Sequence, residues 1–418
     1  MHMNDKKSKI VPRKRFPQFE SSEAWNELTL IQLSDRITDK VGTEKLTTLS
    51  ISAGVGFVSQ AEKFDRDISG NQYRNYIRIK KGDFSYNKGN SKKFPQGCIY
   101  ELNEYEEAAV PNAFISFRFH DDVVSNFYKG YFENNFHGKQ LTKHITSGAR
   151  SNGLLNINAD DFFNIVLPTP KETAEQQKIA DCIKSLDDLI GAENKKLDAL
   201  QNHKNGLMQK FFPEHEESLP ELRFKEFGGK QIDFKNGDEL FDPINNKKHN
   251  CNLPVLAISQ EHGAIPREQI DYNVFVSDKS LESYKVVEIG DFIISLRSFE
   301  GGIEYSVYRG ICSPAYIILR KKIDICDQYF KYYFKTKKFI RDLNKNLEGI
   351  RDGKMVSYNQ FSELLIPVPD RKEQQKIADC LCSIDELIKN QVRKIESLKN
   401  HKKGLLQQLF PSVEEVIK

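Results

Sequence analysis

Several features that would place this 418-residue chain in a common class are missing. No apolar run approaches the roughly 20 residues that a membrane-spanning helix needs. The first residues, MHMNDKKSK, are polar and show no signal peptide. The seven cysteines are odd in number and scattered, and the Cys380-x-Cys382 pair has no second pair or histidine cluster at zinc-site spacing. These absences predict a protein of the reducing cytoplasm without a structural zinc site.

Sequence motifs of common catalytic sites are missing as well. The chain has no G-x-x-x-x-G-K-[ST] loop for a nucleoside triphosphate, no G-x-G-x-x-G after a strand and no H-E-x-x-H. It also lacks the Asn-Pro-Pro-aromatic tetrad of an amino-methyltransferase. Asp370, Glu373 and Lys376 suggest a nuclease cluster, but their spacing is wrong. We therefore predict no catalytic residues, no metal site and no cofactor in this chain.

The net charge excludes fewer functions than the missing motifs do. The formal net charge is only +3, so any basic surface must be local. Six basic residues gather near the N-terminus: Lys6, Lys7, Lys9, Arg13, Lys14 and Arg15. They fit an arm that contacts DNA phosphates, and they fit a solvated tail equally well.

The most informative feature is an internal repeat. Residues 175–213 read EQQKIADCIKSLDDLIGAENKKLDALQNHKNGLMQKFFP, and residues 373–411 read EQQKIADCLCSIDELIKNQVRKIESLKNHKKGLLQQLFP. The two copies align over 39 positions without a gap, and 22 of these positions are identical. Prolines precede each copy and form its last residue, so each copy is predicted to be one long helix. The chain is therefore built from two related halves.

Both copies carry a seam of apolar residues that alternate four and three positions apart. In the first copy these residues are Ile179, Ile183, Leu186, Ile190, Leu197, Leu200 and Leu207. In the second copy they are Ile377, Leu381, Ile384, Ile388, Ile395, Leu398 and Leu405. Sustained spacing of this kind is typical of a coiled coil, so we predict that the two helices pair with each other. Two amphipathic helices that are buried separately are the alternative.

Polar residues interrupt the seam at the same two places in both copies. They are Glu193 and Lys204 in the first copy and Gln391 and Lys402 in the second. Such interruptions fix the register of a coiled coil at a cost in stability. Gly206 and Gly404 also match, although a glycine inside a helix costs about 1 kcal/mol relative to alanine. We interpret them as sites where another backbone approaches closely, with a local kink as the alternative.

The repeat extends beyond the helices at a lower level of similarity. Arg15 matches Arg223, LSIS at 49–52 matches LAIS at 256–259, and a Gly-Asp-Phe motif occurs at 82–84 and 290–292. Short strand patterns alternate with turns and with helical stretches such as Gln328–Lys338. The predicted fold class is α+β: two mixed α/β domains separated by two long helices that form an antiparallel coiled coil, with pseudo-twofold internal symmetry. The predicted boundaries are 1–170, 171–213, 214–369 and 370–418.

The predicted binding residues lie in the loop that follows each Gly-Asp-Phe motif and in two glycine-rich turns. In the first half they are Tyr86, Asn87, Lys88, Lys92, Lys93 and Arg150. In the second half they are Arg297, Ser298, Arg351 and Lys354. Asparagine and arginine make bidentate contacts with adenine and guanine edges, while lysine favours phosphate. Solvated turns would account for each loop alone about as well.

Taken together, these motifs resemble the specificity subunit of a type I restriction-modification system over nearly the whole chain. The motifs that carry the resemblance are EQQKIAD at 175–181 and 373–379, NHKNGLMQKFFP at 202–213, NHKKGLLQQLFP at 400–411 and the two Gly-Asp-Phe turns. In that family each variable domain is a target recognition domain that reads one half of a split DNA site. The paired helices set the distance between the halves.

The resemblance also implies partners. The helices are expected to dock two methylation subunits that carry S-adenosylmethionine, and separate restriction (motor) subunits are expected to use ATP and Mg²⁺. The partners are then double-stranded DNA and these subunits, with no membrane. A stand-alone nuclease or DNA methyltransferase with an unrecognised active site is the main alternative. A helical scaffold that binds no DNA is a third hypothesis.

Overall fold

The computed structural model describes residues 10–66, 69–89, 94–145, 155–214, 219–249, 252–260, 263–269, 281–345 and 356–411. These residues form two compact units. Unit 1 is the chain up to Glu193 together with the segment from Lys394 onward, and unit 2 is Asn194–Arg393. Each unit therefore contains one globular domain, the first part of one long helix and the last part of the other.

The globular domain of unit 1 is built on antiparallel sheets. A four-stranded sheet has the order β2(Ser34–Arg36), β9(Ile115–Phe119), β6(Phe84–Asn87), β7(Cys98–Glu101). Three further pairs are β1(Asn26–Thr29) with β10(Val166–Thr169), β3(Leu49–Ser52) with β4(Gly56–Ser59), and β5(Ile77–Lys80) with β8(Glu107–Val110). The β1–β10 pair brings the first strand of the domain next to its last strand, and β10 leads directly into the first long helix.

Unit 2 repeats this topology strand for strand. Its four-stranded sheet has the order β12(Phe241–Ile244), β19(Ile317–Lys321), β16(Phe292–Ile294), β17(Glu304–Tyr305). Its pairs are β11(Asp233–Asn236) with β20(Leu365–Val368), β13(Leu256–Ser259) with β14(Gly263–Pro266), and β15(Lys285–Val287) with β18(Gly310–Cys312). The predicted α+β repeat is confirmed, although the loops of the two domains differ.

Short helices complete each domain. In unit 1 they are η1(Pro17–Phe19), α1(Leu30–Leu33), α2(Gln60–Phe64), η2(Gly70–Asn75), α3(Ser125–Glu133), α4(Phe136–Leu141), η3(Thr142–His144) and α5(Ala159–Phe163). In unit 2 they are η4(Lys225–Phe227), α7(Gly237–Leu240), η5(Arg267–Gln269), α9(Ser298–Gly301), α10(Asp327–Tyr333), α11(Lys337–Asn344) and α12(Tyr358–Ser362). The helical stretch predicted over Gln328–Lys338 is helical at both ends but is divided between two helices. The chain breaks between α10 and α11, where the Thr336 hydroxyl caps α11 by accepting from Phe339 N at 3.2 Å.

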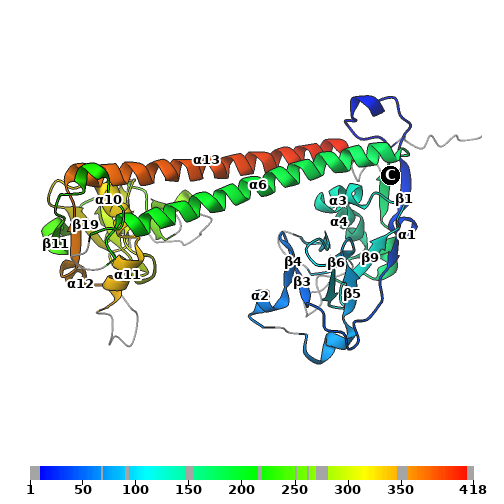
Figure 1. The fold of residues 1–418 in the computed structure, drawn as a ribbon, viewed down its shortest axis with the longest axis horizontal. Helices are drawn as coiled ribbons and strands as arrows, with labels where there is room; N and C mark the ends of the chain where they lie inside the picture. Colours follow the sequence, from blue (N-terminus) through cyan, green and yellow to red (C-terminus); the bar gives the residue numbers. More distant parts are fainter. Residues whose placement is uncertain are drawn as a thin grey trace, which may run out of the picture. The chain divides into compact units, whose positions relative to one another are not determined.

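Aromatic side chains make the core of each domain. In unit 1, α3 and α4 lie against the four-stranded sheet (Figure 1), and Phe84 and Phe117 of the sheet meet Phe132 of α3 with ring centroids 5.8 and 6.0 Å apart. His137 of α4 lies in the same core, only 1% exposed, with its ring edge-on to Tyr86 at 5.9 Å. Each such contact stabilises the fold beyond the area that it buries.

The buried His137 predicts a pH-dependent stability of unit 1. Burial lowers the pKa of His137 to about 4 from its ordinary value of 6.5. Between these values the unfolded chain binds the proton and the folded chain does not, so stability falls as the pH falls through this window. The contribution of His137 changes the free energy of unfolding by at most about 1.4 kcal/mol per pH unit. The free energy of unfolding in urea, measured from pH 7 to pH 4, should include this slope. The His137→Phe variant should lack the part of the slope that His137 contributes.

The matched control is His120→Gln, because His120 is 38% exposed and pairs with Asp35 at 3.4 Å on the surface. Carboxylates titrate in the same range, so the quantity to compare is the difference between each variant and the wild type. A pH dependence unchanged by His137→Phe would contradict the assignment.

The two long helices, α6(Thr173–Phe211) and α13(Arg371–Leu409), are 39 residues each. All the predicted seam residues are buried or half-buried. In unit 1, Lys402 Nζ lies 2.6 Å from Asp187 and Lys394 Nζ lies 2.5 Å from Glu193. In unit 2, Lys204 Nζ lies 2.6 Å from Asp385. In each unit the helices therefore run side by side and antiparallel (Figure 1), and separate burial of the two helices is excluded.

These ion pairs explain the polar interruptions of the seam. Lys204 and Lys402 are equivalent residues of the repeat, and so are Asp187 and Asp385. Each lysine pairs with the aspartate of the other helix, so the two contacts are reciprocal. Lys402 also reaches Glu133 of α3 at 2.5 Å, which ties the helix pair to the domain. A shift by one helical turn would break these pairs, so they fix the register.

The interpretation of Gly206 and Gly404 is wrong. A Cβ atom added at either glycine would meet nothing within 4 Å, so neither marks the close approach of another backbone. A glycine in close contact with the end of α13 is Gly130 of α3, which sequence reasoning missed; it faces a side chain and not a backbone. A Cβ atom at Gly130 would lie 2.4 Å from the ring of Phe410, which follows α13 and packs in the core of unit 1.

Candidate functional site

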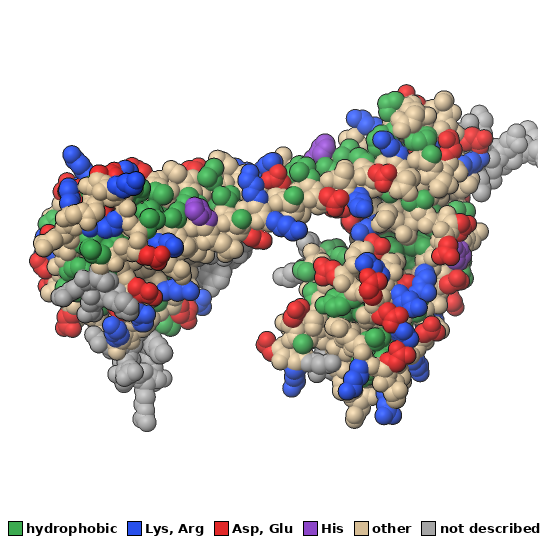
Figure 2. Space-filling view, in the orientation of Figure 1, with side chains coloured by type: hydrophobic (Ala, Val, Ile, Leu, Met, Phe, Trp, Pro, Cys, Tyr) green, Lys and Arg blue, Asp and Glu red, His purple; other side chains and the backbone are tan. Residues whose placement is uncertain are grey.

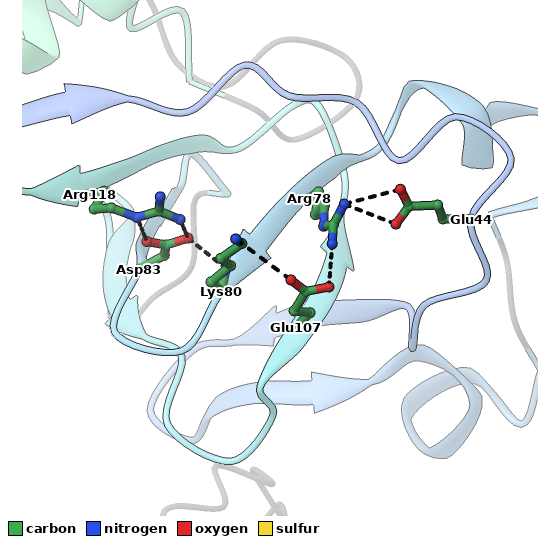
Figure 3. A network of polar contacts seen from close by, with 6 residues as sticks. All are labelled: Glu44, Arg78, Lys80, Asp83, Glu107 and Arg118. Carbon is green, nitrogen blue, oxygen red and sulfur yellow. Dashed lines mark hydrogen bonds and ion pairs between the residues drawn. The ribbon is translucent and has the colours of Figure 1, made fainter.

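The two Gly-Asp-Phe turns have a structural role. The Asp83 carboxylate accepts from Lys80 N at 2.6 Å and from both Nε and Nη2 of Arg118, at 2.6 and 2.7 Å (Figure 3). In unit 2, Asp291 makes the same bonds to Glu288 N and Arg320, at 2.7–2.8 Å. Each aspartate is 1% exposed. The motif thus closes a turn and joins it to the neighbouring strand.

On the surface around this turn in unit 1, carboxylates balance the charges of the arginines. Arg78 lies between Glu44 and Glu107, whose carboxylates are 3.0 and 2.6 Å from its guanidinium (Figure 3). The hydrogen bond from Arg78 to Glu107 raises the pKa of Arg78. Asp35 stands opposite Arg118 on the adjacent strand. Because each arginine has carboxylate neighbours, this end of the sheet is a poor site for a phosphate.

Two predicted DNA contacts are contradicted by burial. Tyr86 is fully buried: its ring stacks on Phe162 at 4.7 Å and its hydroxyl donates to Gln96 O at 2.6 Å. Burial raises the pKa of Tyr86 well above its ordinary range. Ser298 is also fully buried, and its hydroxyl accepts from Ser295 N at 2.8 Å. Neither side chain can reach a base, so both are core or turn residues.

Asn87 and Lys88 are half-buried and bind their own domain. The Asn87 amide donates to Ile51 O at 3.4 Å and accepts from Gly89 N at 2.9 Å. Lys88 Nζ donates to Ile157 O at 3.4 Å. The Asn87 bond to Ile51 holds the end of β6 beside strand β3, and the Lys88 bond holds the following loop beside the segment that precedes α5. In this arrangement Asn87 positions the loop, because both atoms of its amide already have protein partners.

Among the predicted contacts that the structure describes, Arg297 is the exposed one. Its side chain is exposed, at the residue that precedes α9. Its backbone is held at both ends, because Arg297 N donates to Ser295 Oγ at 3.3 Å and Arg297 O accepts from Gln260 Nε2 at 2.7 Å. A fixed backbone that carries an exposed guanidinium is well suited to a bidentate contact.

The remaining predicted contacts divide into two groups. Lys92, Lys93, Arg150, Arg351 and Lys354 lie outside the described residues, as do Lys6, Lys7 and Lys9 of the proposed N-terminal arm. Arg15 is described, and for this residue the arm hypothesis is wrong. The Arg15 side chain is 8% exposed and forms a bidentate ion pair with the buried Glu175. Arg15 therefore anchors the N-terminal segment to α6.

Sequence reasoning missed a hairpin beside each loop. Asn87 bonds to Ile51 of β3 in unit 1, and Arg297 bonds to Gln260, which follows β13, in unit 2. The β3–β4 and β13–β14 hairpins therefore occupy equivalent places next to the two predicted loops. The signal was present in LSIS and LAIS, each of which precedes a short turn and a second strand pattern.

Metal-binding clusters and membrane-spanning helices are both absent from the part of the chain that the structure describes. Among the described residues no group of three or more His, Cys, Asp or Glu side chains is arranged to hold a metal ion. No helix in the described ranges is long and apolar enough to cross a membrane. Figure 2 shows acidic and basic side chains interspersed over the visible face of the unit 1 domain.

Comparisons with known proteins show similarity to one family. A family model described as "Type I restriction modification DNA specificity domain" matches residues 54–202 and again residues 232–400. A protein of Methanocaldococcus jannaschii assigned as the MjaX specificity subunit is 25% identical over 299 residues, 69% of this chain and 68% of that protein. The MjaVIII specificity subunit of the same organism is 26% identical over 284 residues, 64% of this chain and 66% of that protein.

Solved structures share the fold. The S subunit of a type I restriction-modification system from M. genitalium superposes with a TM-score of 0.56 at 14% identity, over 96% of this chain and 100% of that one. A chain from a structure determined to explain complex assembly and conformational transition of the type I R-M system gives a TM-score of 0.54 at 16% identity, over 95% and 99% of the two chains.

Proposed function

From the premise that the chain belongs to the type I restriction-modification DNA specificity family, we propose that each globular domain reads one half of a bipartite DNA site. The observation that carries the proposal is the equivalent placement of a fixed loop and a hairpin in the two units. The two domains share a topology but differ in these loops, as expected if each reads a different short sequence. Base contacts in the grooves then specify the site, and lysines hold the backbone.

The paired helices are proposed to set the distance between the two half-sites. The reciprocal ion pairs of Lys204 and Lys402 support this role because they fix the helix register. The helices are also proposed to dock the two methylation subunits. Leu189 and Leu387, which are equivalent residues of the repeat, are 41% and 54% exposed outside the seam. In this proposal the methylation subunits would cover these two leucines, which lie at the same place on each helix.

In this proposal the chain itself is not catalytic. S-adenosylmethionine would bind to the methylation subunits, and ATP and Mg²⁺ to the restriction subunits. Incubating the pure chain with DNA, Mg²⁺ and S-adenosylmethionine is expected to give neither cleavage nor methyl transfer. Turnover by protein free of other subunits would favour the alternative, a nuclease or methyltransferase with an unrecognised site.

Arg297→Ala is expected to weaken recognition of one half-site only. If the guanidinium makes a bidentate contact with a base, the loss is about 1–3 kcal/mol and is confined to that position. The measurement is the affinity for duplexes that vary one half-site at a time. The matched control is Arg309→Ala, since Arg309 is 60% exposed but pairs with Glu288 beside the Gly-Asp-Phe turn. An equal loss on every sequence would show a phosphate contact instead.

A further inference from the structure

The tip of the β3–β4 hairpin presents an apolar side chain to solvent. The two strands pair through Ser52 and Gly56, and Val55 N donates to Ser52 O at 3.0 Å to close the turn. Val55 is 73% exposed, although valine usually packs against other residues. This exposure leaves the apolar side chain accessible to a binding partner.

The tip is held in place. Gly54 N donates to the hydroxyl of Tyr100 on β7 at 2.7 Å. Gly54 and Gly56 have φ angles of 86° and 115°, which a side chain would strain, so the sequence Gly-Val-Gly suits this turn. Val55 is thus the one side chain that could extend between these two glycines, on a backbone that Tyr100 fixes. A contact made by a pre-ordered tip costs less conformational entropy.

The hairpin also adjoins the loop that the proposed function assigns to DNA. The carbonyl oxygen of Ile51 in β3 accepts from the Asn87 amide at 3.4 Å and from Lys63 Nζ at 3.2 Å. One backbone group therefore joins the hairpin, the loop and a lysine of α2. An ammonium has three donors, so Lys63 keeps donors for a phosphate.

We propose that the β3–β4 hairpin enters the groove of double-stranded DNA and that Val55 makes an apolar contact with a base edge. A two-stranded ribbon fits the major groove, which is about 12 Å wide. Valine has no hydrogen-bonding group, so it selects the 5-methyl group of thymine. This inference rests on the proposed function and adds a specificity residue to the first recognition domain.

The test uses the full-length chain and a duplex library with randomised positions, selected for binding in parallel with wild type, Val55→Ser and Ile31→Ser. Ile31 is the matched control, because it is 60% exposed in the same unit but lies on α1. Val55→Ser is expected to lose about tenfold in affinity and its base preference at one or two adjacent positions of one half-site. Ile31→Ser should select the wild-type site with wild-type affinity.

Replacing thymine by uracil at the affected position removes only the methyl group. The wild type should then lose about tenfold in affinity, as Val55→Ser does. The Val55→Ser variant should bind the thymine and uracil duplexes equally well. If the wild type selects a bipartite site and Val55→Ser selects it equally well, the hairpin proposal is overturned while the proposed function stands. The same holds if Val55→Ser weakens only the capture of a methylation subunit. A wild type that selects no sequence overturns both.

Discussion

Glu373→Gln is expected to lower the free energy of unfolding of unit 2 by about 3–5 kcal/mol, because it leaves a buried arginine without its counter-charge. Arg223 Nε and Nη2 lie 2.8 and 2.7 Å from the two Glu373 oxygens, and the side chains are 7% and 1% exposed. The pair joins the segment that enters the second domain to the start of α13. Hydrogen exchange followed along a denaturant series would assign the loss to unit 2.

The chain supplies a matched control in the same two segments. Glu226 pairs with Lys376, and these side chains are 49% and 46% exposed. Such surface pairs contribute about 0–1 kcal/mol, so Glu226→Gln should have little effect. Replacing both members of the buried pair, as Arg223→Met with Glu373→Leu, should recover much of the stability. If Glu373→Gln costs no more than Glu226→Gln, the buried pair does not anchor the domain.

Inserting one heptad at equivalent seam positions of α6 and α13 is expected to change the spacer of the DNA site. Seven residues lengthen a helix by about 10 Å at ~1.5 Å per residue, while the seam stays in phase. At ~3.4 Å per base pair this is roughly three base pairs. Three base pairs also rotate one half-site by over a quarter turn, given ~10.5 base pairs per turn, so affinity for the original site should fall sharply.

The control for this experiment is the same heptad in α6 alone. That insertion shifts one helix by a heptad, so the two lysine–aspartate pairs cannot form at the same time. It should therefore lower the stability of the protein and should not select a longer spacer. The double insertion should instead stay folded and select a longer spacer. Binding by the double insertion with an unchanged spacer would contradict the role of the helices as a ruler.

The helices could be predicted because their pattern is local and repeated. The seam needs only the 4-3 spacing of apolar residues, and the reciprocal lysines occur at matching places in the two copies. The error at Tyr86 was avoidable in the same way. Phe84 and Tyr86 are two positions apart on β6, so they point to the same face of the sheet, and that face is the core.

Other features depend on contacts that are distant in sequence. Asn87 binds Ile51, 36 positions earlier, and no local pattern indicates that its amide is already occupied. Arg15 reads as one charge of a basic arm, yet its partner Glu175 is 160 positions away. Gly206 and Gly404 drew attention because they match, whereas Gly130 has the close contact, with Phe410 at the other end of the chain. Tertiary packing decides each of these cases.

The central claim is that two domains read two half-sites at a fixed distance. The most direct test is selection of duplexes from a randomised library by the full-length chain, followed by sequencing of the bound DNA. The account predicts two short specified blocks separated by a spacer of free sequence and constant length, with Arg297→Ala degrading one block and Val55→Ser the other. A single continuous block, or two blocks at variable spacing, would contradict it.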